Sequence, residues 1–259
     1  MKTVLLIFIL VSTLFAKDIE ADYKITFGIF GQIGIAKTSL HVEGKRYKIT
    51  LYAKSTGFAS FISGNRQEWY ESIGKIEDGR LLPDSYKKIV QREVSVSNAT
   101  EMDSKTEIKR YILIYKFNHK NKEIYSTKIK IRGKSRSEDT QRVKFYTKDD
   151  LLSLFFNFKK LFPTLDIKKH YTLHAVGANK DNGKIDLLPL KKGDFKRLIS
   201  GDLSKLKLMK VILSDKIFAS KKGELYLGLD KNGLCEKAVL KDVILFGDIR
   251  GELIEKSHK

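Results

Sequence analysis

Two histidines have the spacing of a possible metal site. His170 and His174 stand four residues apart, so they would share one face on a helix and also on a strand. A zinc site needs three or four His, Cys or carboxylate ligands, and no Asp, Glu or Cys neighbour completes such a set in the sequence. We therefore predict an exposed or core-packed pair, and no metal site.

Two acidic pairs could do acid/base chemistry, in which one carboxyl group acts as the acid and the other as the base. Glu68 and Glu71 fit a solvated strand face. Asp149 and Asp150 precede an apolar run and fit the positive N-terminal end of a helix. We predict a structural role for both pairs.

Motifs for nucleophilic catalysis or phosphate binding do not occur in the sequence. A nucleophilic hydrolase needs a Ser or Cys beside a His and an acid, and Cys235, the only cysteine, is predicted to be a small apolar residue on a strand. Gly28, Gly31 and Gly34 lie in a strand pattern without a Lys-Ser or Lys-Thr directly after them, which indicates bends or close packing. The chain is therefore predicted to be non-enzymatic and to use no cofactor.

Large apolar side chains are the remaining candidates for a binding site. They could line an apolar cavity with a helix as its plug or lid, which would suit an acyl chain, and lysines at its rim would suit an anionic head group. Alternatively, the same side chains fill a packed core. The candidate cavity or core residues are Phe27, Phe30, Phe58, Phe61, Trp69, Leu151, Leu154, Phe155 and Phe158.

The elements that would position these residues are mostly strands. Residues 23–55 alternate apolar and polar side chains around a Gly-containing turn, which predicts an antiparallel hairpin. A second hairpin is predicted from the β-rich residues 106–117 and 122–131. Glycines bracket residues 56–63, which predicts a bend or bulge there. The charged residues 132–141 are predicted to form a loop. Further strands are expected at residues 85–96, 169–177, 185–190, 206–214, 224–230, 235–240 and 243–254.

One helix beyond the N-terminus is expected at about residues 148–162. Thr147 or Asp149 can cap its start, and Lys159 and Lys160 favour its C-terminal end. Because its interior is apolar on most sides, it should lie buried in the concavity of the sheet. The predicted fold class is mainly β, a curved antiparallel sheet or open half-barrel packed around this central helix.

The N-terminus is predicted to be a signal peptide of residues 1–16, a short helix. Lys2 precedes an apolar run at residues 4–15, and the small Ala16 follows it. A helix of that length is too short for the hydrocarbon core of a bilayer. Cleavage would release residues 17–259 into the periplasm as a single domain. The alternative is an uncleaved N-terminus that tethers the chain to the membrane.

The chain is strongly basic, with a formal net charge of +19. This charge could attract an anionic membrane surface. It could equally reflect lysines spread over a solvated surface. Nucleic acid is not an expected partner, because an exported chain rarely meets it and no recognition motif is present.

Three sequence blocks together resemble a known bacterial family. They are YKITFGIFGQIGIAKTSLHVEGKRYKITLYAKSTG with the later GRLLPDSY, then DDLLSLFFNFKKL, then ELYLGLDKNGLCEKAVLKDVILFGDIRGEL. In this order they resemble the domain of unknown function 3108 (DUF3108) over about residues 23–253. The family often has a proline where this chain has Cys235 and Glu236.

The resemblance implies an exported envelope protein with a curved β structure wrapped partly around a helix, similar in outline to periplasmic lipoprotein carriers. It supplies no catalytic residues. The leading hypothesis is a periplasmic, non-enzymatic protein that binds an apolar or lipid-like ligand or supports the cell envelope. One alternative is an envelope scaffold or protein-interaction module with a fully packed core, and another is a hydrolase of envelope polymers.

Overall fold

The structure is a computed structural model that describes residues 18–96, 105–166, 168–179, 181–196, 198, 202–213, 223–243 and 247–258. The predicted signal peptide, residues 1–16, lies outside the described residues. Among the described residues, no helix is long and apolar enough to cross a membrane.

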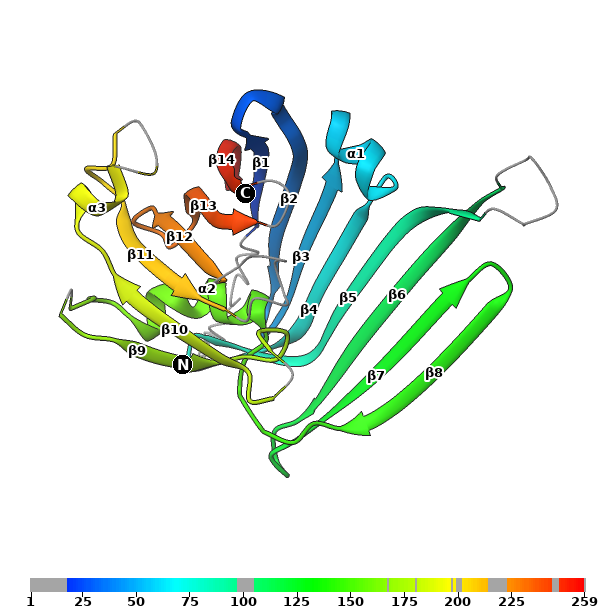
Figure 1. The fold of residues 1–259 in the computed structure, drawn as a ribbon. Helices are drawn as coiled ribbons and strands as arrows, with labels where there is room; N and C mark the ends of the chain where they lie inside the picture. The colour runs from blue at the N-terminus through cyan, green and yellow to red at the C-terminus, as the bar shows by residue number, and fades with distance from the viewer. Residues whose placement is uncertain are drawn as a thin grey trace, which may run out of the picture.

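The described residues form one antiparallel sheet of 14 strands with a few short helices (Figure 1). The strands of the first half are β1 (Ile19–Phe27), β2 (Gly31–Glu43), β3 (Arg46–Ser55), β4 (Gln67–Glu77), β5 (Arg80–Val96), β6 (Lys105–Asn118), β7 (Glu123–Arg132) and β8 (Ser135–Arg142). Those of the second half are β9 (Tyr171–His174), β10 (Lys184–Pro189), β11 (Lys207–Ile212), β12 (Glu224–Leu229), β13 (Cys235–Val243) and β14 (Gly247–His258). The helices are η1 (Gly28–Phe30), α1 (Gly57–Ser63), α2 (Leu151–Leu161) and α3 (Lys192–Lys196).

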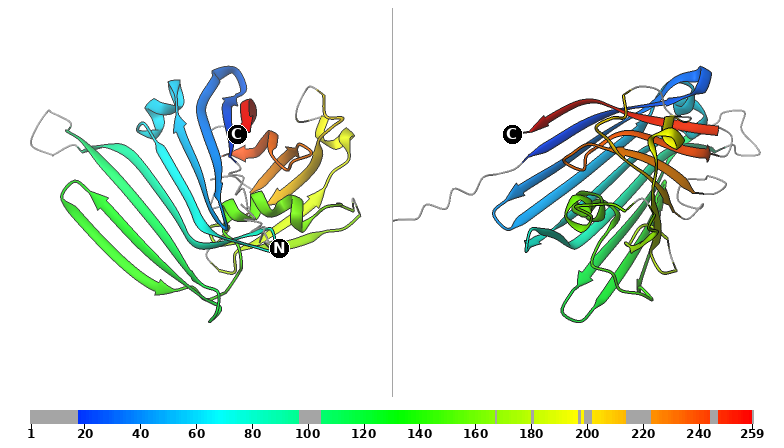
Figure 2. Two further views of the ribbon diagram at one scale, coloured as in Figure 1. Left: turned by 180° about the vertical axis from the view of Figure 1, so that it is seen from behind. Right: turned by 90° about the vertical axis from the view of Figure 1, so that its left-hand side faces the viewer.

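Two meanders make up the sheet. The chain runs from β1 to β8 at one edge, passes through α2 to β9 at the other edge, and returns to β14, which pairs with β1. The edge strands β8 and β9 do not pair, so the sheet is open. The sheet bends, and α2 lies between its two wings (Figures 1 and 2). The prediction of a mainly β, curved and open antiparallel fold is therefore confirmed.

The first predicted hairpin is formed by β2 and β3. Its turn at Gly44 has φ of +58°, a conformation that glycine adopts without strain. The pairing runs from Glu43 opposite Arg46 to Gly34 opposite Ser55. Period-two alternation places Tyr47 and Ile49 in the core, because successive side chains of a strand point to opposite faces.

Two local predictions are wrong. The charged stretch 132–141 is mostly an edge strand, β8, with all eight residues exposed. Its backbone pairs with β7 whatever its side chains are, and a charged edge strand discourages pairing with other chains. Residues 57–63 form the helix α1 rather than a bend or bulge in a strand, and Gly64 ends α1 at φ of +67°.

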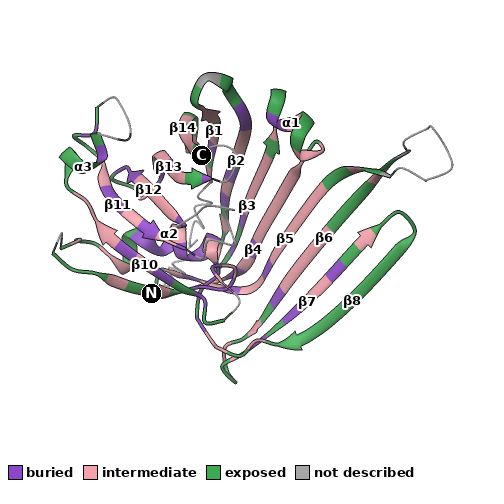
Figure 3. Cartoon of the chain, in the orientation of Figure 1, coloured by how far each residue is buried: buried purple, intermediate pink, exposed green. Residues whose placement is uncertain are grey.

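Two apolar clusters pack against α2. Figure 3 shows that much of α2 and parts of the strands around it are buried. Leu154 and Phe158 of α2 pack with strands β10 to β12, whereas Leu152 packs with Tyr86 and other residues of β2 to β7. A smaller cluster centres on Phe195 of α3. The helix α2 thus joins the two wings of the sheet through opposite sides of its surface.

Candidate functional site

The face of the sheet that carries α2, called here the inner face, has three cross-strand rows of side chains on β1 to β6. In each row the residues lie opposite one another in register. The first row is Ile19, Leu40, Ile49, Ser72, Tyr86 and Tyr115. The second row is Ala21, Thr38, Leu51, Tyr70, Lys88 and Leu113. The third row is Tyr23, Ala36, Ala53, Glu68, Val90 and Tyr111.

Burial falls from the first row to the third. All of the first row except Ile19 is buried, since it packs beneath α2. The second row is buried only at Ala21 and Thr38, and every residue of the third row is half-buried. On the facing wing, Leu225, Leu227 and Ala238 are also half-buried. An apolar surface therefore continues along the inner face beyond the cover of α2. We call this surface, the second and third rows, the trough.

A charged cluster occupies one part of the trough. Glu68 accepts hydrogen bonds from Arg66 Nε, at 2.6 Å, and from the hydroxyl of Tyr70. Lys88 Nζ lies 3.6 Å from Glu68 Oε2 and 5.0 Å from the centre of the Tyr70 ring. Two cations thus face one carboxylate, which leaves this part of the trough with a net positive charge.

Burial and charge shift the ionisation of this cluster. Burial lowers the pKa of Lys88, although Glu68 opposes the shift. Burial alone would raise the pKa of Glu68, but Lys88, Arg66 and the Tyr70 hydroxyl outweigh it and lower that pKa. Glu68 is therefore held as an anion. Lys88 is a cation that an approaching anion would stabilise further.

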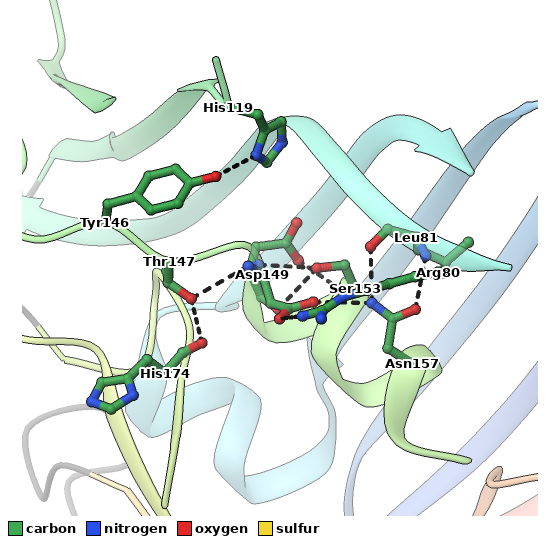
Figure 4. A network of polar contacts seen from close by, with 10 residues as sticks. Arg80, Leu81, His119, Tyr146, Thr147, Asp149, Ser153, Asn157 and His174 are labelled. Carbon is green, nitrogen blue, oxygen red and sulfur yellow. Dashed lines mark hydrogen bonds and ion pairs between the residues drawn. The ribbon is translucent and has the colours of Figure 1, made fainter. Parts of the chain in front are cut away.

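Buried polar contacts fix α2 to the start of β5 (Figure 4). The side-chain amide of Asn157 pairs with the backbone of Leu81 as a neighbouring strand would: its Oδ1 accepts from Leu81 N and its Nδ2 donates to Leu81 O, both at 2.8 Å. Asn157 also donates to Asp149 Oδ1 at 3.0 Å, and Asp149 pairs with Arg80. A polar anchor therefore sets the position of the helix.

Asp150, and not Thr147 or Asp149, caps α2. Its carboxylate accepts from Leu152 N at 2.7 Å and Ser153 N at 2.9 Å, and Ser72 Oγ donates to it at 2.6 Å. Burial raises the pKa of Asp150 to about 7, although these donors oppose the shift. The predicted structural role of this aspartate is thus a cap linked to strand β4.

The predicted cavity or core residues separate into three environments. Leu154 and Phe158 are buried, and Leu151 and Phe155 are partly buried in the same cluster. Trp69 is half-buried on the opposite, outer face of the sheet, with its ring 5.5 Å from that of Tyr52.

The third environment is the end of the sheet near α1. Phe27 is half-buried there, but Phe30, Phe58 and Phe61 are 49%, 55% and 85% exposed. The prediction of a cavity or core position is wrong for these three exposed residues. Apolar composition could not reveal this exposure, because the three residues lie on the short helices η1 and α1 at the end of the sheet and not on a strand face.

The other candidates from the sequence occupy separate places. His170 pairs with Asp186 at 3.1 Å, His174 is exposed, and the described residues contain no cluster of three or more His, Cys, Asp or Glu suited to a metal. Glu68 and Glu71 lie on opposite faces of β4, since they are three residues apart. Cys235 is buried, and burial raises the pKa of its thiol to about 12.

The outer face has a shallow groove of about 440 Å³ between β3 and β6. An in-register row of apolar side chains crosses this face. The row consists of Tyr52, Trp69, Ile89, Ile112 and Ile129. Glu71, Lys87 and Arg110 lie at the polar rim of the groove.

Sequence reasoning missed the charged cluster of the trough. The alternation of side chains along β4 could have indicated it. Glu68, Tyr70 and Ser72 are spaced two residues apart, so their side chains share the inner face. Comparison with protein-family models, with curated proteins and with solved structures finds no match to this chain. The resemblance to DUF3108 therefore stays a prediction.

Proposed function

We propose that the protein is a non-enzymatic carrier or receptor for an amphiphile with an anionic head, such as a fatty acid or an acidic lipid. In this proposal the sheet acts as an open half-barrel, with α2 as its central helix and plug. The acyl chain lies along the trough, and the head group meets Arg66 and Lys88. We also propose that the predicted signal peptide exports the protein to the periplasm and that the protein is related to DUF3108.

One observation carries the proposal: the inner face continues past α2 into rows that are only partly buried, with Ala21 and Thr38 as the buried exceptions. A sheet normally buries its apolar face against a second layer. An apolar surface without such a layer is a typical site for an apolar ligand or partner. Ala36 and Ala53, which have small side chains, lie opposite each other in the third row, and the cationic cluster gives the surface a polar end.

The test is a titration of the full chain with a dansyl-labelled fatty acid, followed by fluorescence. We expect saturable binding, which Ala53→Phe should weaken at least about tenfold because the ring fills the trough. Lys88→Gln should weaken binding about tenfold through loss of a charge-assisted contact.

Lys54→Gln is the matched control, because Lys54 is exposed and follows Ala53 on the opposite face of β3. It should leave the affinity unchanged. A wild-type chain that shows no saturable binding would contradict the proposal, and so would equal affinities of the Lys88→Gln and Lys54→Gln variants.

The second candidate is an envelope scaffold or protein-interaction module. The groove and the apolar row on the outer face favour it, because aromatic residues with a polar rim are typical of protein interfaces. Trp69→Arg should then abolish capture of an envelope partner and leave fatty-acid binding intact. The hydrolase alternative receives no comparable support, since His41 with Asp18 and His170 with Asp186 are surface pairs outside the groove.

A further inference from the structure

Four of the seven large apolar side chains that are exposed among the described residues gather at one end of the sheet. Phe58, Phe61 and Ile62 belong to α1, and Phe30 belongs to η1 in the turn between β1 and β2. Their exposed fractions are 55%, 85%, 46% and 49%. Figures 1 and 2 place this turn and α1 side by side at the same end of the sheet. We call these four residues the aromatic tip.

The tip is an ordered part of the fold. The ring of Phe30 stacks between Phe27 and Phe58, with centroid distances of 5.5 and 5.2 Å. Thr56 N donates to Ile33 O at 2.8 Å, which ties the start of α1 to β2. These contacts hold the phenylalanine rings in place while they remain exposed.

Contacts at the end of α1 hold it from the other side. Asn65 Nδ2 donates to Glu93 Oε2 at 2.7 Å, and Glu93 N donates to Gly64 O at 2.7 Å. A side chain at Gly64 would meet the carbonyl of Glu93 at 2.1 Å, so this close approach needs glycine. Only Ala59 of α1 is buried, and the helix presents its phenylalanines outward.

Several exposed cations lie at the same end of the sheet as the tip. Lys54 precedes α1 and Arg92 precedes Glu93, and both are exposed. Lys109 and Lys134 are exposed at the same end of β6 and at the β7–β8 turn. With the +19 formal charge of the chain, this arrangement complements an anionic surface.

We infer that the aromatic tip inserts into the interfacial region of an anionic phospholipid bilayer. Aromatic side chains favour that region, and lysine and arginine near its surface add electrostatic attraction to anionic head groups. Four side chains are too few for a stable protein interface, which usually needs 20 to 30 residues a side. The inference does not depend on ligand binding in the trough.

The test places a fluorescent reporter in the tip of the full chain. Phe61→Trp is combined with Trp69→Phe, so that position 61 carries the only tryptophan, and vesicles of phosphatidylcholine with phosphatidylglycerol are added. We expect the emission to shift to shorter wavelength and brominated lipids to quench it. High salt or pure phosphatidylcholine should reduce both effects.

The wild-type chain is the matched control, because its single tryptophan, Trp69, lies on the outer face and should show neither effect. Adding Phe58→Ser to the reporter variant should abolish the shift, whereas adding Ile254→Ser, which is exposed on β14, should preserve it. No shift with anionic vesicles would overturn the inference. The inference would also be overturned if, without lipid, the emission shifted increasingly with protein concentration. The tip would then bind a second copy of the chain.

Discussion

Replacing Asn157 with leucine should lower the free energy of unfolding by about 3–5 kcal/mol. Leucine has a similar size, but it leaves the N–H and C=O of Leu81 buried without their partners on α2. It also removes a donor to Asp149, which is 4% exposed. Urea denaturation of the full chain, extrapolated linearly to water, measures the change.

Lys159→Leu is the control for this substitution. Lys159 lies two residues after Asn157 on α2 and is exposed, so substitution with the same residue, leucine, should change the stability by less than about 0.5 kcal/mol. If Asn157→Leu cost less than about 1 kcal/mol, the amide would not be an anchor of the helix. The position of α2 would then rest on its apolar contacts alone.

The stability of the protein should decrease as the pH rises from about 4 to 7, and Asp150→Asn should flatten this dependence. The pKa of Asp150 is raised to about 7 by burial, above the ordinary value of 3.8. Between these values the folded state binds more protons than the unfolded state, so raising the pH favours unfolding. The loss can reach about 4 kcal/mol, at about 1.4 kcal/mol per pH unit.

Asparagine suits this position because it caps helices well and resembles the protonated carboxyl group. Its amide can donate to Ser72 Oγ, as the acid would. Burial also raises the pKa of Asp149, opposed by Arg80, so the variant should keep a smaller slope of the same sign. Urea denaturation at several pH values measures both profiles. Parallel profiles of the wild type and the variant would show that Asp150 does not titrate in this range.

Local sequence patterns were sufficient for most strands. The alternation of β2 and β3, the turn at Gly44, and the two β-rich runs of β6 and β7 all depend on backbone preferences within a few residues. The start of α2 was less well predicted. Thr147, Asp149 and Asp150 are all capable caps, and long-range contacts distinguish them: Thr147 donates to His174 O, Asp149 pairs with Arg80, and Asp150 accepts from Ser72, 78 residues earlier.

The errors have a common physical origin. Strand β8 lacks apolar residues, so its side chains carry no sign of the pairing that its backbone makes with β7. Phe58 and Phe61 look like core residues by composition, and only the position of α1 at the end of the sheet exposes them. Side-chain type reports what a residue can do, whereas burial depends on which distant elements cover it.

The sequence by itself determined the β-rich composition, the hairpins, the apolar helix before Pro163 and the basic charge. Tertiary structure alone decided the anchor between Asn157 and Leu81, the position of Lys88 beside Glu68 and Tyr70, and the gradient of burial across the inner face. These features join segments whose register is set by long-range strand pairing and by the return of β14 to β1. Local propensities do not encode that return, because it depends on the free energy of the whole packed sheet.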